Sequence, residues 1–526
     1  MRDGYKIVLT AERCLMSNYN NALFLGFTAC GPKSLINPFF YFRFVCPPVP
    51  TYNGGIAKNA PYGLRKIEAA LLDYGFDENE VVVVVPDKIR KFVGPNTKII
   101  GVSSNDPLGK GPASTTFSGP LGLVHEESYI AWKFRELVTD PYLKKWDAKI
   151  VVGGPGAWQL EDPEPRRELG IDVVVIGEGE NVVPPLFEKI IRGEDVPEVV
   201  YGDVVEVDKM SIIRNPTVCS LVEVARGCGR GCRFCVPTLR RLRSRPLEHI
   251  LKEVEVNLRD GPRWINLHAE DILRYKAHGI KVNRQAVIEL WESIMKMDGV
   301  IGVGPSHFAL SSIASEPTLL EELSTIVGVG TKDKPWIAGQ TGIESGSPRI
   351  MSIHMRGKVL PFKPDEWPDV VEQAFGICKD SNWVPCATLI MGLPGETEDD
   401  VIKTIELLDR LKDYKSLIVP LFFVPLGVLK NERGFGVQDM NEYHWELMLA
   451  CWDYDIRWLV ELARDYLHQM NWVARAFMMR FVNFVVKKAN KRVRKIVHER
   501  MEEVSKSKTY LTIEEDGIDG WKRINR

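Results

Sequence analysis

The sequence predicts an α/β protein in three parts: a doubly wound domain over residues 1–205, a partial (β/α) barrel over 206–425 and a helical region over 426–526. In the first part, continuous β-branched runs alternate with helical segments. In the second, predicted strands end repeatedly in polar or glycine-containing turns. In the third, two long segments lack glycine and proline. A chain of 526 residues leaves room for about three domains of ordinary size.

The first part is predicted to be a Rossmann-like domain with a parallel sheet. Runs that are β-branched throughout indicate strands buried on both faces, as in a sheet covered by helices. Between two of these runs, Leu64, Ile67 and Leu71 recur at helical spacing within residues 62–74. The predicted strands are residues 6–9, 81–85, 99–102, 150–152 and 173–176.

Two glycine-rich loops follow strands of this domain. Residues 153–157 read Gly-Gly-Pro-Gly-Ala, and residues 177–180 read Gly-Glu-Gly-Glu. In doubly wound folds, ligands bind at the loops that follow the carboxyl ends of the strands. We therefore expect a ligand site at this edge of the sheet.

Three cysteines at the start of the second part carry the strongest chemical signal. Cys228, Cys232 and Cys235 have C-x3-C-x2-C spacing in a segment that also contains three glycines. Three thiolates on one tight loop can hold three irons of a 4Fe–4S cluster and leave the fourth iron without a protein ligand. The spacing differs from the paired C-x2-C motifs of zinc sites. Three incidental thiols in a chain with ten cysteines are the alternative.

The rest of the second part predicts alternating strands and helices. Ile250, Val254 and Leu258 lie at helical spacing. Strand and turn signals follow in residues 264–272, 302–308, 339–347 and 387–397, and another helix is predicted over 370–380. This repetition favours a partial barrel whose chemistry lies at the carboxyl ends of the strands.

The third part predicts two long helices, over residues 441–465 and 472–500. In the second helix an apolar stripe from Val482 to Val497 is flanked by lysines and arginines. The first half of the same helix carries the aromatic residues Trp472, Phe477, Phe481 and Phe484. Such a basic amphipathic helix suits an anionic membrane surface, so peripheral membrane contact is one interpretation. The interpretation we favour is a packing helix with a solvated basic face.

Composition and charge exclude several classes of protein. The net charge of −2 argues against binding nucleic acid through overall charge. The cysteines outside the motif are scattered, which argues against a disulfide framework. No apolar run reaches the roughly 20 residues of a membrane span, and residues 1–20 lack a signal-peptide pattern. We expect a cytoplasmic protein that is peripheral to the membrane if the basic helix contacts lipid.

The cysteine motif resembles that of the radical S-adenosylmethionine superfamily, and the motifs of residues 206–425 follow the order of that family's barrel. The resemblance implies that the three cysteines bind a 4Fe–4S cluster whose open iron binds S-adenosylmethionine. It also implies contacts from Phe234 to the adenine, from Glu270 and Asp271 to the methionine amino group, from Glu344 and Ser345 to the ribose, and from Gly392 near the adenine. Helix caps and ordinary turns are the structural alternatives for these residues.

The glycine-rich loops resemble those of the cobalamin-binding domain attached to one large class of these enzymes. The cobalamin contacts that the resemblance implies are Asp106, Leu108, Gly109, Gly153, Gly154, Gly156, Gly177, Glu178 and Gly179. A ligand-free flavodoxin-like domain is the alternative. The D-x-H-x-x-G motif through which some cobalamin domains bind cobalt is absent, and His125 is the only histidine before His249. We therefore expect the lower face of cobalt to lack a protein imidazole.

Together the resemblances imply a cobalamin-dependent radical S-adenosylmethionine methyltransferase that methylates an unactivated carbon. The expected substrate is a protein or peptide side chain, as in the methylation of methyl-coenzyme M reductase, or a lipid or natural product. We also expect a flavodoxin- or ferredoxin-type reductant as a partner. We do not expect the protein to bind nucleic acid.

Three alternatives remain open at the level of sequence. A radical cyclase that joins archaeal membrane lipid chains, similar to tetraether synthases, is supported by the basic aromatic helix. A cobalamin-binding sensor with a degenerate barrel is disfavoured by the intact cysteine triad. A transfer-RNA methylthiolase would need a second cysteine-bound cluster, and the candidates Cys14, Cys30 and Cys46 are widely spaced.

Overall fold

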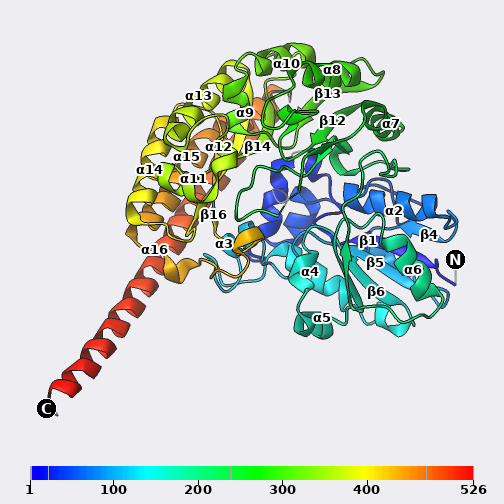
Figure 1. Cartoon of the computed structure of the whole chain (residues 1–526), viewed down its shortest axis with the longest axis horizontal. Coiled ribbons are helices and arrows are strands. Elements are labelled where there is room, and N and C mark those ends of the chain that lie inside the picture. Colours follow the sequence, from blue (N-terminus) through cyan, green and yellow to red (C-terminus); the bar gives the residue numbers. More distant parts are fainter. Residues whose placement is uncertain (1–2, 22, 237–239, 470, 525–526) are drawn as a thin grey trace.

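A computed structural model describes residues 3–21, 23–236, 240–469 and 471–524 of the chain. A Rossmann-like domain and a barrel lie side by side, and the last helix projects away from both (Figure 1). The α/β fold class predicted from the sequence is confirmed.

The sheet of the first domain has six parallel strands in the order β4-β1-β5-β6-β7-β8. Because the chain moves to one side of β1 and then to the other, the switch point of the sheet lies between β1 and β5. The five predicted strands are confirmed, and β8 was not predicted. The strands are β1 (Ile7–Ala11), β4 (Val81–Val83), β5 (Ile99–Ser103), β6 (Lys149–Gly153), β7 (Val173–Gly177) and β8 (Val199–Gly202).

Both faces of this sheet are buried, as its β-branched runs predicted. Ile7 and Leu9 of β1 belong to the hydrophobic core on one face, and Val8 belongs to the core on the other. The covering helices are α2 (Tyr62–Tyr74), α4 (Tyr129–Val138), α5 (Pro163–Leu169) and α6 (Val183–Ile191), while α3 (Pro112–Phe117) packs against the barrel domain. A long segment after β1 contains α1 (Pro38–Phe40), β2 (Thr51–Tyr52) and β3 (Ile56–Ala57).

The partial barrel consists of two parallel three-stranded sheets. One has the order β13-β12-β9 and the other β14-β15-β16. An isolated parallel bridge between His307 and Gln340 connects them. The strands are β9 (Leu221–Glu223), β12 (Arg263–His268), β13 (Val300–Pro305), β14 (Ile337–Glu344), β15 (Trp383–Met391) and β16 (Leu417–Phe422). The predicted strands are confirmed, while β9 and β16 were missed.

Helices cover the outside of the barrel, and a short hairpin of β10 (Ala225–Arg226) and β11 (Arg243–Ser244) flanks the cysteine loop. The helices are α7 (Leu247–Leu258), α8 (Arg284–Met295), α9 (Leu310–Ser315), α10 (Leu319–Val327), α11 (Pro348–His354), α12 (Arg356–Val359), α13 (Trp367–Asp380) and α14 (Glu398–Leu411). They enclose the largest hydrophobic core of the chain.

The C-terminal region is formed by α15 (Glu442–Tyr466) and α16 (Trp472–Ile524). Trp445, Met448 and Cys451 of α15 enter the barrel core. The end of α16 extends beyond the body of the molecule (Figure 1). Among the helices of the described residues, none has the length and apolar character needed to cross a membrane.

A buried charge network joins the two domains. Glu253 of α7 accepts hydrogen bonds from Lys66 Nζ (2.5 Å) and Tyr62 OH (2.8 Å) of α2, and from Arg245 Nη1 (2.7 Å). All four side chains are buried. Since a buried ion pair is strongly destabilised when one partner is lost, this network fixes α2 against the barrel.

Candidate active site

The cysteine loop follows β10, close to the carboxyl end of β9. Gly227, Gly229 and Gly231 have φ values of +78°, +67° and +75°, in the left-handed region that other residues rarely adopt. A Cβ on Gly227 would lie 2.5 Å from the carbonyl oxygen of Arg241. The alternation of glycine and cysteine is therefore what allows the chain to turn tightly enough to present three thiols on one short loop.

The three thiols fit a cluster in number and chemistry. Burial raises the pKa of both Cys228 and Cys232, while the charge of Arg230 acts to lower the first and that of Lys358 the second. A metal must displace these protons, because it is the thiolate that coordinates. Among the described residues no three Cys, His, Asp or Glu side chains converge as one metal ion would require. A cubane cluster instead takes one cysteine per iron.

Arg230, within the cysteine motif, anchors the loop to the barrel. Its guanidinium donates to Asp271 Oδ2 (2.8 Å), Ser312 Oγ (2.8 Å) and Ser311 Oγ (3.0 Å). Asp271 also accepts from the backbone N–H of Ala309 (3.2 Å) and from Ser312. The carboxylate of Asp271 is thus engaged in holding the loop. The predicted contact of Asp271, and of Glu270 beside it, to the methionine amino group stays a prediction.

Further backbone contacts hold the cysteine loop from both sides. Arg274 Nη1 donates to the carbonyl of Cys228 (2.9 Å). The carbonyl of Arg233 accepts from the N–H of Val428 (2.8 Å). A Cβ on Gly357 of α12 would lie only 1.7 Å from the carbonyl oxygen of Arg230. The loop is thus in close contact with three segments that follow it in the sequence.

Glu344, at the end of β14, forms a buried pair beside the loop. Its carboxylate accepts from Lys358 Nζ (2.6 Å) and Thr388 Oγ1 (3.0 Å), and its backbone has a φ of +64°. Burial acts to lower the pKa of Lys358, but Glu344 and Cys232 outweigh it, so the pKa lies above its usual value. An ammonium group and a carboxylate therefore lie next to the cysteine loop. The predicted ribose contact of Glu344 stays a prediction.

The other residues expected to contact S-adenosylmethionine have mixed surroundings. Phe234 packs, partly buried, against the barrel core. The hydroxyl of Ser345 accepts from the N–H of Ser347 (3.1 Å) and lies against α14. Gly392 has a φ of +80°, and a Cβ there would lie 2.1 Å from the Phe435 ring. Ser345 and Gly392 thus have contacts within the barrel wall, and their expected contacts to S-adenosylmethionine, like that of Phe234, stay predictions.

Sequence reasoning missed a polar group at the carboxyl ends of β12 and β13. Ser306 Oγ lies 2.9 Å from both His268 Nδ1 and His307 Nδ1. Burial, with the nearby His268, lowers the pKa of His307 to about 3, so this imidazole is neutral at physiological pH. Histidines at two neighbouring strand ends were the sequence signal that could have identified the group.

The opposite wall of the barrel is apolar. Thr388, which bonds to Glu344, is paired in register with Val419, and Ile390 is paired with Leu421. Residues two apart on a strand, and residues opposite each other on neighbouring strands, share a face. These side chains therefore face the same side as Glu344.

In the Rossmann-like domain, the loops after β5 and β6 lie together. Asp106 Oδ1 accepts from Gln159 Nε2 (2.6 Å), and Gln159 Oε1 accepts from the N–H of Leu108 (2.9 Å). A Cβ on Gly156 would lie 2.4 Å from the backbone of Asn105, so glycine allows the two loops to touch. Gly109, Gly153 and Gly154 lie in the same pair of loops.

The loop after β7, from Gly177 to Gly179, is directed at the barrel domain. Glu178 accepts from Arg243 Nη2 (2.6 Å), Arg240 Nη1 (2.9 Å) and Arg226 Nη1 (3.1 Å), which flank the cysteine loop. Burial acts to raise the pKa of Glu178, but these cations and the N–H of Val205 outweigh it and lower the value to about 2. Glu178 is therefore an ion-pair partner of the barrel domain, and its expected cobalamin contact stays a prediction.

Glu12, directly after β1, is a buried acid at the switch point. Neither carboxylate oxygen has a hydrogen-bond partner among the described residues. Burial raises the pKa of Glu12 well above its usual value, and the charges of Asp106 and Cys46 add to the effect. Among the described residues, the carboxyl edge of the sheet thus holds an unsatisfied polar group, and no motif in the sequence had singled it out.

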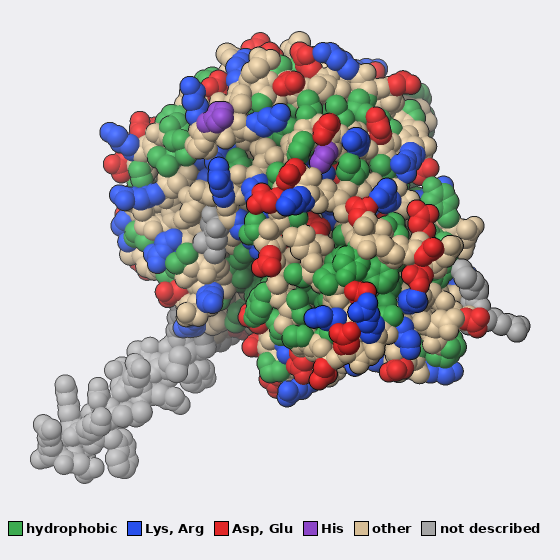
Figure 2. Space-filling view, turned by 45° about the vertical axis from the view of Figure 1, so that its right-hand side comes forward, with side chains coloured by type: hydrophobic (Ala, Val, Ile, Leu, Met, Phe, Trp, Pro, Cys, Tyr) green, Lys and Arg blue, Asp and Glu red, His purple; other side chains and the backbone are tan. Residues whose placement is uncertain are grey.

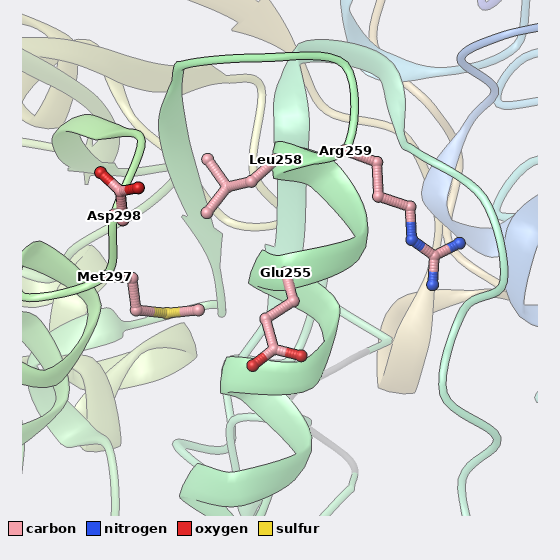
Figure 3. Close-up of a pocket in the computed structure, with 5 residues that line it drawn as sticks. All are labelled: Glu255, Leu258, Arg259, Met297 and Asp298. Carbon is pink, nitrogen blue, oxygen red and sulfur yellow. The ribbon is translucent and has the colours of Figure 1, made fainter.

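The pocket on the outside of the barrel is not at the candidate active site. A pocket of about 380 Å³ lies on the outside of the barrel, where Leu258 and Arg259 end α7 and Met297 and Asp298 follow α8 (Figure 3). Its residues lie away from the cysteine loop and the carboxyl ends of the strands. The side chains visible on the face in Figure 2 intersperse Lys and Arg with Asp and Glu, which gives no single-signed field there.

Residues 222–408 match the family model described as the Radical SAM superfamily. The match spans the cysteine loop and most of the barrel strands. The chain therefore contains a radical SAM domain. The partial barrel and the three-cysteine loop are the two features that place it in this class.

Among solved structures, the chain is similar to TsrM, a radical S-adenosylmethionine methyltransferase from Kitasatospora setae solved with cobalamin and a [4Fe-4S] cluster bound. The TM-score is 0.51 at 15% identity, over 81% of this chain and 74% of that chain. A second TsrM structure, with tryptophan substrate and a SAM analog bound, gives 0.50 at 16% identity, over 81% and 75%. The chain thus shares the overall fold of TsrM.

Curated relatives match a smaller part of the chain. The tRNA-2-methylthio-N(6)-dimethylallyladenosine synthase of Marinomonas sp. (strain MWYL1) is 24% identical over 272 residues, 50% of this chain and 55% of the relative. An uncharacterized protein of Methanocaldococcus jannaschii is 28% identical over 341 residues, 54% of this chain and 64% of the relative. The chain thus spans between half and two thirds of the length of these relatives.

Proposed function

We propose that the chain is a cobalamin-dependent radical S-adenosylmethionine methyltransferase that acts on an unactivated carbon. One observation carries the proposal: the carboxyl edges of the two sheets face each other. Glu178, after β7, is paired with the arginines around the cysteine loop. Phe422, ending β16, donates its N–H to Thr116 Oγ1 of α3, which follows β5 (2.7 Å). Ligand-binding edges of both folds therefore meet in one place.

The residues of the cysteine loop suit a cluster with one iron free of protein ligands. Cys228, Cys232 and Cys235 would hold it, Glu270 would offer a carboxylate to the methionine amino group, and Glu344 would contact the ribose. Bound together, these cofactors would supply a carbon radical able to remove hydrogen from an unactivated position, and the corrinoid would supply a methyl group.

The carboxyl edge of the first sheet suits a corrinoid. The unpartnered oxygens of Glu12 lie beside Asp106, where the amide side chains of a corrin ring could donate hydrogen bonds. The loop after β1 carries Glu12, Arg13 and Cys14 and no histidine. A protein imidazole is therefore not expected to bind cobalt, and electron paramagnetic resonance should show no side-chain nitrogen hyperfine coupling.

The barrel's own side chains would position the substrate. The group of Ser306, His268 and His307 offers hydrogen bonds on one wall, and the neutral His307 adds no charge. The opposite wall offers Ile390, Val419 and Leu421. A substrate with a polar end and a hydrocarbon portion fits such walls, which supports a protein or peptide side chain, as in methyl-coenzyme M reductase, or a lipid chain.

The methylthiolase alternative finds less support. Cys14 and Cys46 are hydrogen-bonded to each other, while Cys30 lies beside Ser114 and Asp106. A radical cyclase of archaeal lipid chains is the second candidate, because the exposed aromatic face of α16 supports contact with lipid.

The test uses protein purified and reconstituted without oxygen, with methyl-labelled S-adenosylmethionine and candidate substrates. We expect iron and sulfide near four each per chain, bound cobalamin, and label in the product. Cys232→Ala should lose most iron and all deoxyadenosine formation yet still bind cobalamin. Cys378→Ala, the same change at a buried cysteine of α13, should keep both. A new carbon–carbon bond without label would favour the cyclase, and deoxyadenosine formation by Cys232→Ala would refute the assignment.

A further inference from the structure

The first four turns of α16 expose an unusual amount of aromatic surface. Trp472, Phe477, Phe481 and Phe484 are 76%, 69%, 53% and 62% exposed. Residues three or four apart share a face of a helix, so Val473, Phe477, Phe481 and Phe484 form one apolar row that faces solvent. Contiguous exposed apolar surface of this kind marks an interaction site.

A second aromatic segment lies in the long connection after β1. Phe39, Phe40 and Phe44 are 71%, 55% and 60% exposed, and the rings of Phe40 and Phe44 stack with centroids 6.2 Å apart. This segment is more than 400 residues from α16 in the sequence, as the numbering shows. Its three phenylalanine side chains are nevertheless exposed to a similar extent as the aromatic side chains of α16.

Hydrogen bonds bring the two segments together. Tyr466, at the end of α15, donates to the carbonyl of Asn20 (3.3 Å), and Asn20 Nδ2 donates to the carbonyl of Phe44 (2.9 Å). Further along α16, Arg492 Nη1 donates to the carbonyl of Leu35 (3.3 Å). Residues 35–44 therefore lie alongside the first half of α16. We call the exposed side chains of residues 39–44 and 472–485 the aromatic surface.

The charge next to the aromatic surface has one sign. Residues 472–495 contain eight Lys and Arg residues and no Asp or Glu. Lys488 and Lys491 continue the row of Phe481 and Phe484 along the exposed face of α16, and Lys487 lies beside them. Lys487, Lys488 and Lys491 form no ion pair with any described residue. A chain with a net charge of −2 thus concentrates unpaired positive charge beside its aromatic surface.

We propose that the aromatic surface and these lysines dock the protein onto an anionic lipid bilayer. Aromatic side chains suit the interfacial region of a bilayer, and adjacent lysines suit anionic headgroups. The aromatic residues stand on convex helical surface, which a deformable lipid surface can cover without a matching groove. The absence of a membrane-crossing helix among the described residues makes this contact interfacial. The proposal is independent of the reaction proposed above.

The packing interpretation of α16 and the docking proposal concern different faces of the helix. Val493, Ile496 and Val497 of the apolar stripe lie against the barrel core. The side chains of Phe477, Phe481 and Phe484 are more than half exposed.

The test is flotation of the full-length chain with vesicles of phosphatidylcholine alone or mixed in equal parts with phosphatidylglycerol. We expect binding to the mixed vesicles, at least tenfold weaker binding to the neutral ones, and weakening by salt. Phe477→Ser with Phe481→Ser, and separately Lys487→Gln with Lys488→Gln, should each weaken binding to mixed vesicles at least tenfold. The matched control, Lys296→Gln with Lys403→Gln on exposed barrel helices, should bind like the parent.

Thermal unfolding of each variant checks that the fold is intact, and light scattering after size exclusion gives the oligomeric state. The proposal is overturned if the parent chain does not float with mixed vesicles, or if the folded variants bind as well as the parent. It is also overturned if the chain forms a dimer that the phenylalanine variants dissociate while no vesicle binding occurs. That last result would make the aromatic surface a contact between two copies.

Discussion

Replacing Glu178 with glutamine removes the central charge between the two domains while keeping the size of the side chain. The pKa of Glu178 is lowered from an ordinary 4.5 to about 2. At about 1.4 kcal/mol per pKa unit, this shift corresponds to about 3 kcal/mol of stabilisation at neutral pH. The side chain is only 5% exposed, so screening by solvent is small. Arg240 and Arg243 would lose their carboxylate in the variant, which acts in the same direction.

The expected result for Glu178→Gln is a loss of about 3 kcal/mol in the free energy of unfolding at pH 7, measured in urea. If the whole chain unfolds as one unit, the matching fall in the thermal midpoint is about 3 °C, from an unfolding entropy of about 2.1 cal/mol/K per residue. Glu188→Gln is the control, because Glu188 makes an ion pair with Arg192 that is exposed. Exposed pairs contribute about 0–1 kcal/mol, so this variant should stay close to the parent.

The pH dependence gives a second check on the same reasoning. Because the folded pKa of Glu178 is depressed, its contribution is present above the unfolded pKa and is lost as pH falls through the folded value. The gap between parent and Glu178→Gln should therefore narrow from about pH 4.5 down to about pH 2. A gap below about 1 kcal/mol at neutral pH, or one that does not change with pH, would refute the argument.

Two further predictions concern other parts of the fold. Gly357→Ala places a Cβ 1.7 Å from the carbonyl of Arg230, so we expect a loss of about 1–3 kcal/mol in unfolding free energy and reduced iron after reconstitution. Gly376→Ala, whose Cβ would meet nothing closer than 3.8 Å, should be neutral or stabilising, and equal behaviour of the two variants would contradict the prediction. Burial raises the pKa of Asp455 to about 8, so the stability of the parent should fall as pH rises from about 4 to about 8. Asp455→Asn should remove that fall, which is measured as the thermal midpoint of both proteins against pH. Parallel curves for the parent and the variant would contradict the prediction.

The main architecture was predictable because it rests on local patterns. Strands such as β1 and β5 are runs of β-branched residues, and burial on both faces needs little information from elsewhere in the chain. The strands that were missed have weaker patterns. β8 is largely accessible, and β9 has only three residues before the cysteine loop.

The roles of individual charged residues could not be predicted in the same way. Glu178 and its partner Arg243 are 65 residues apart in the sequence, and Arg230 and Asp271 are 41 apart. A carboxylate at the end of a strand looks the same in the sequence whether it faces a ligand or an arginine. Whether such a carboxylate faces a ligand or an arginine depends on tertiary packing. For Glu178 it is the packing of the two domains, and for Asp271 it is the packing of α9 against the cysteine loop.

The anchoring of the cysteine loop through Arg230 has a consequence for how the metal centre would be assembled. Arg230 lies between Cys228 and Cys232, and its contacts to Ser311, Ser312 and Asp271 involve protein groups alone. The conformational entropy of this segment is therefore lost when the polypeptide folds. An incoming iron–sulfur unit meets thiols already held on a rigid support, and more of its binding free energy is retained as affinity.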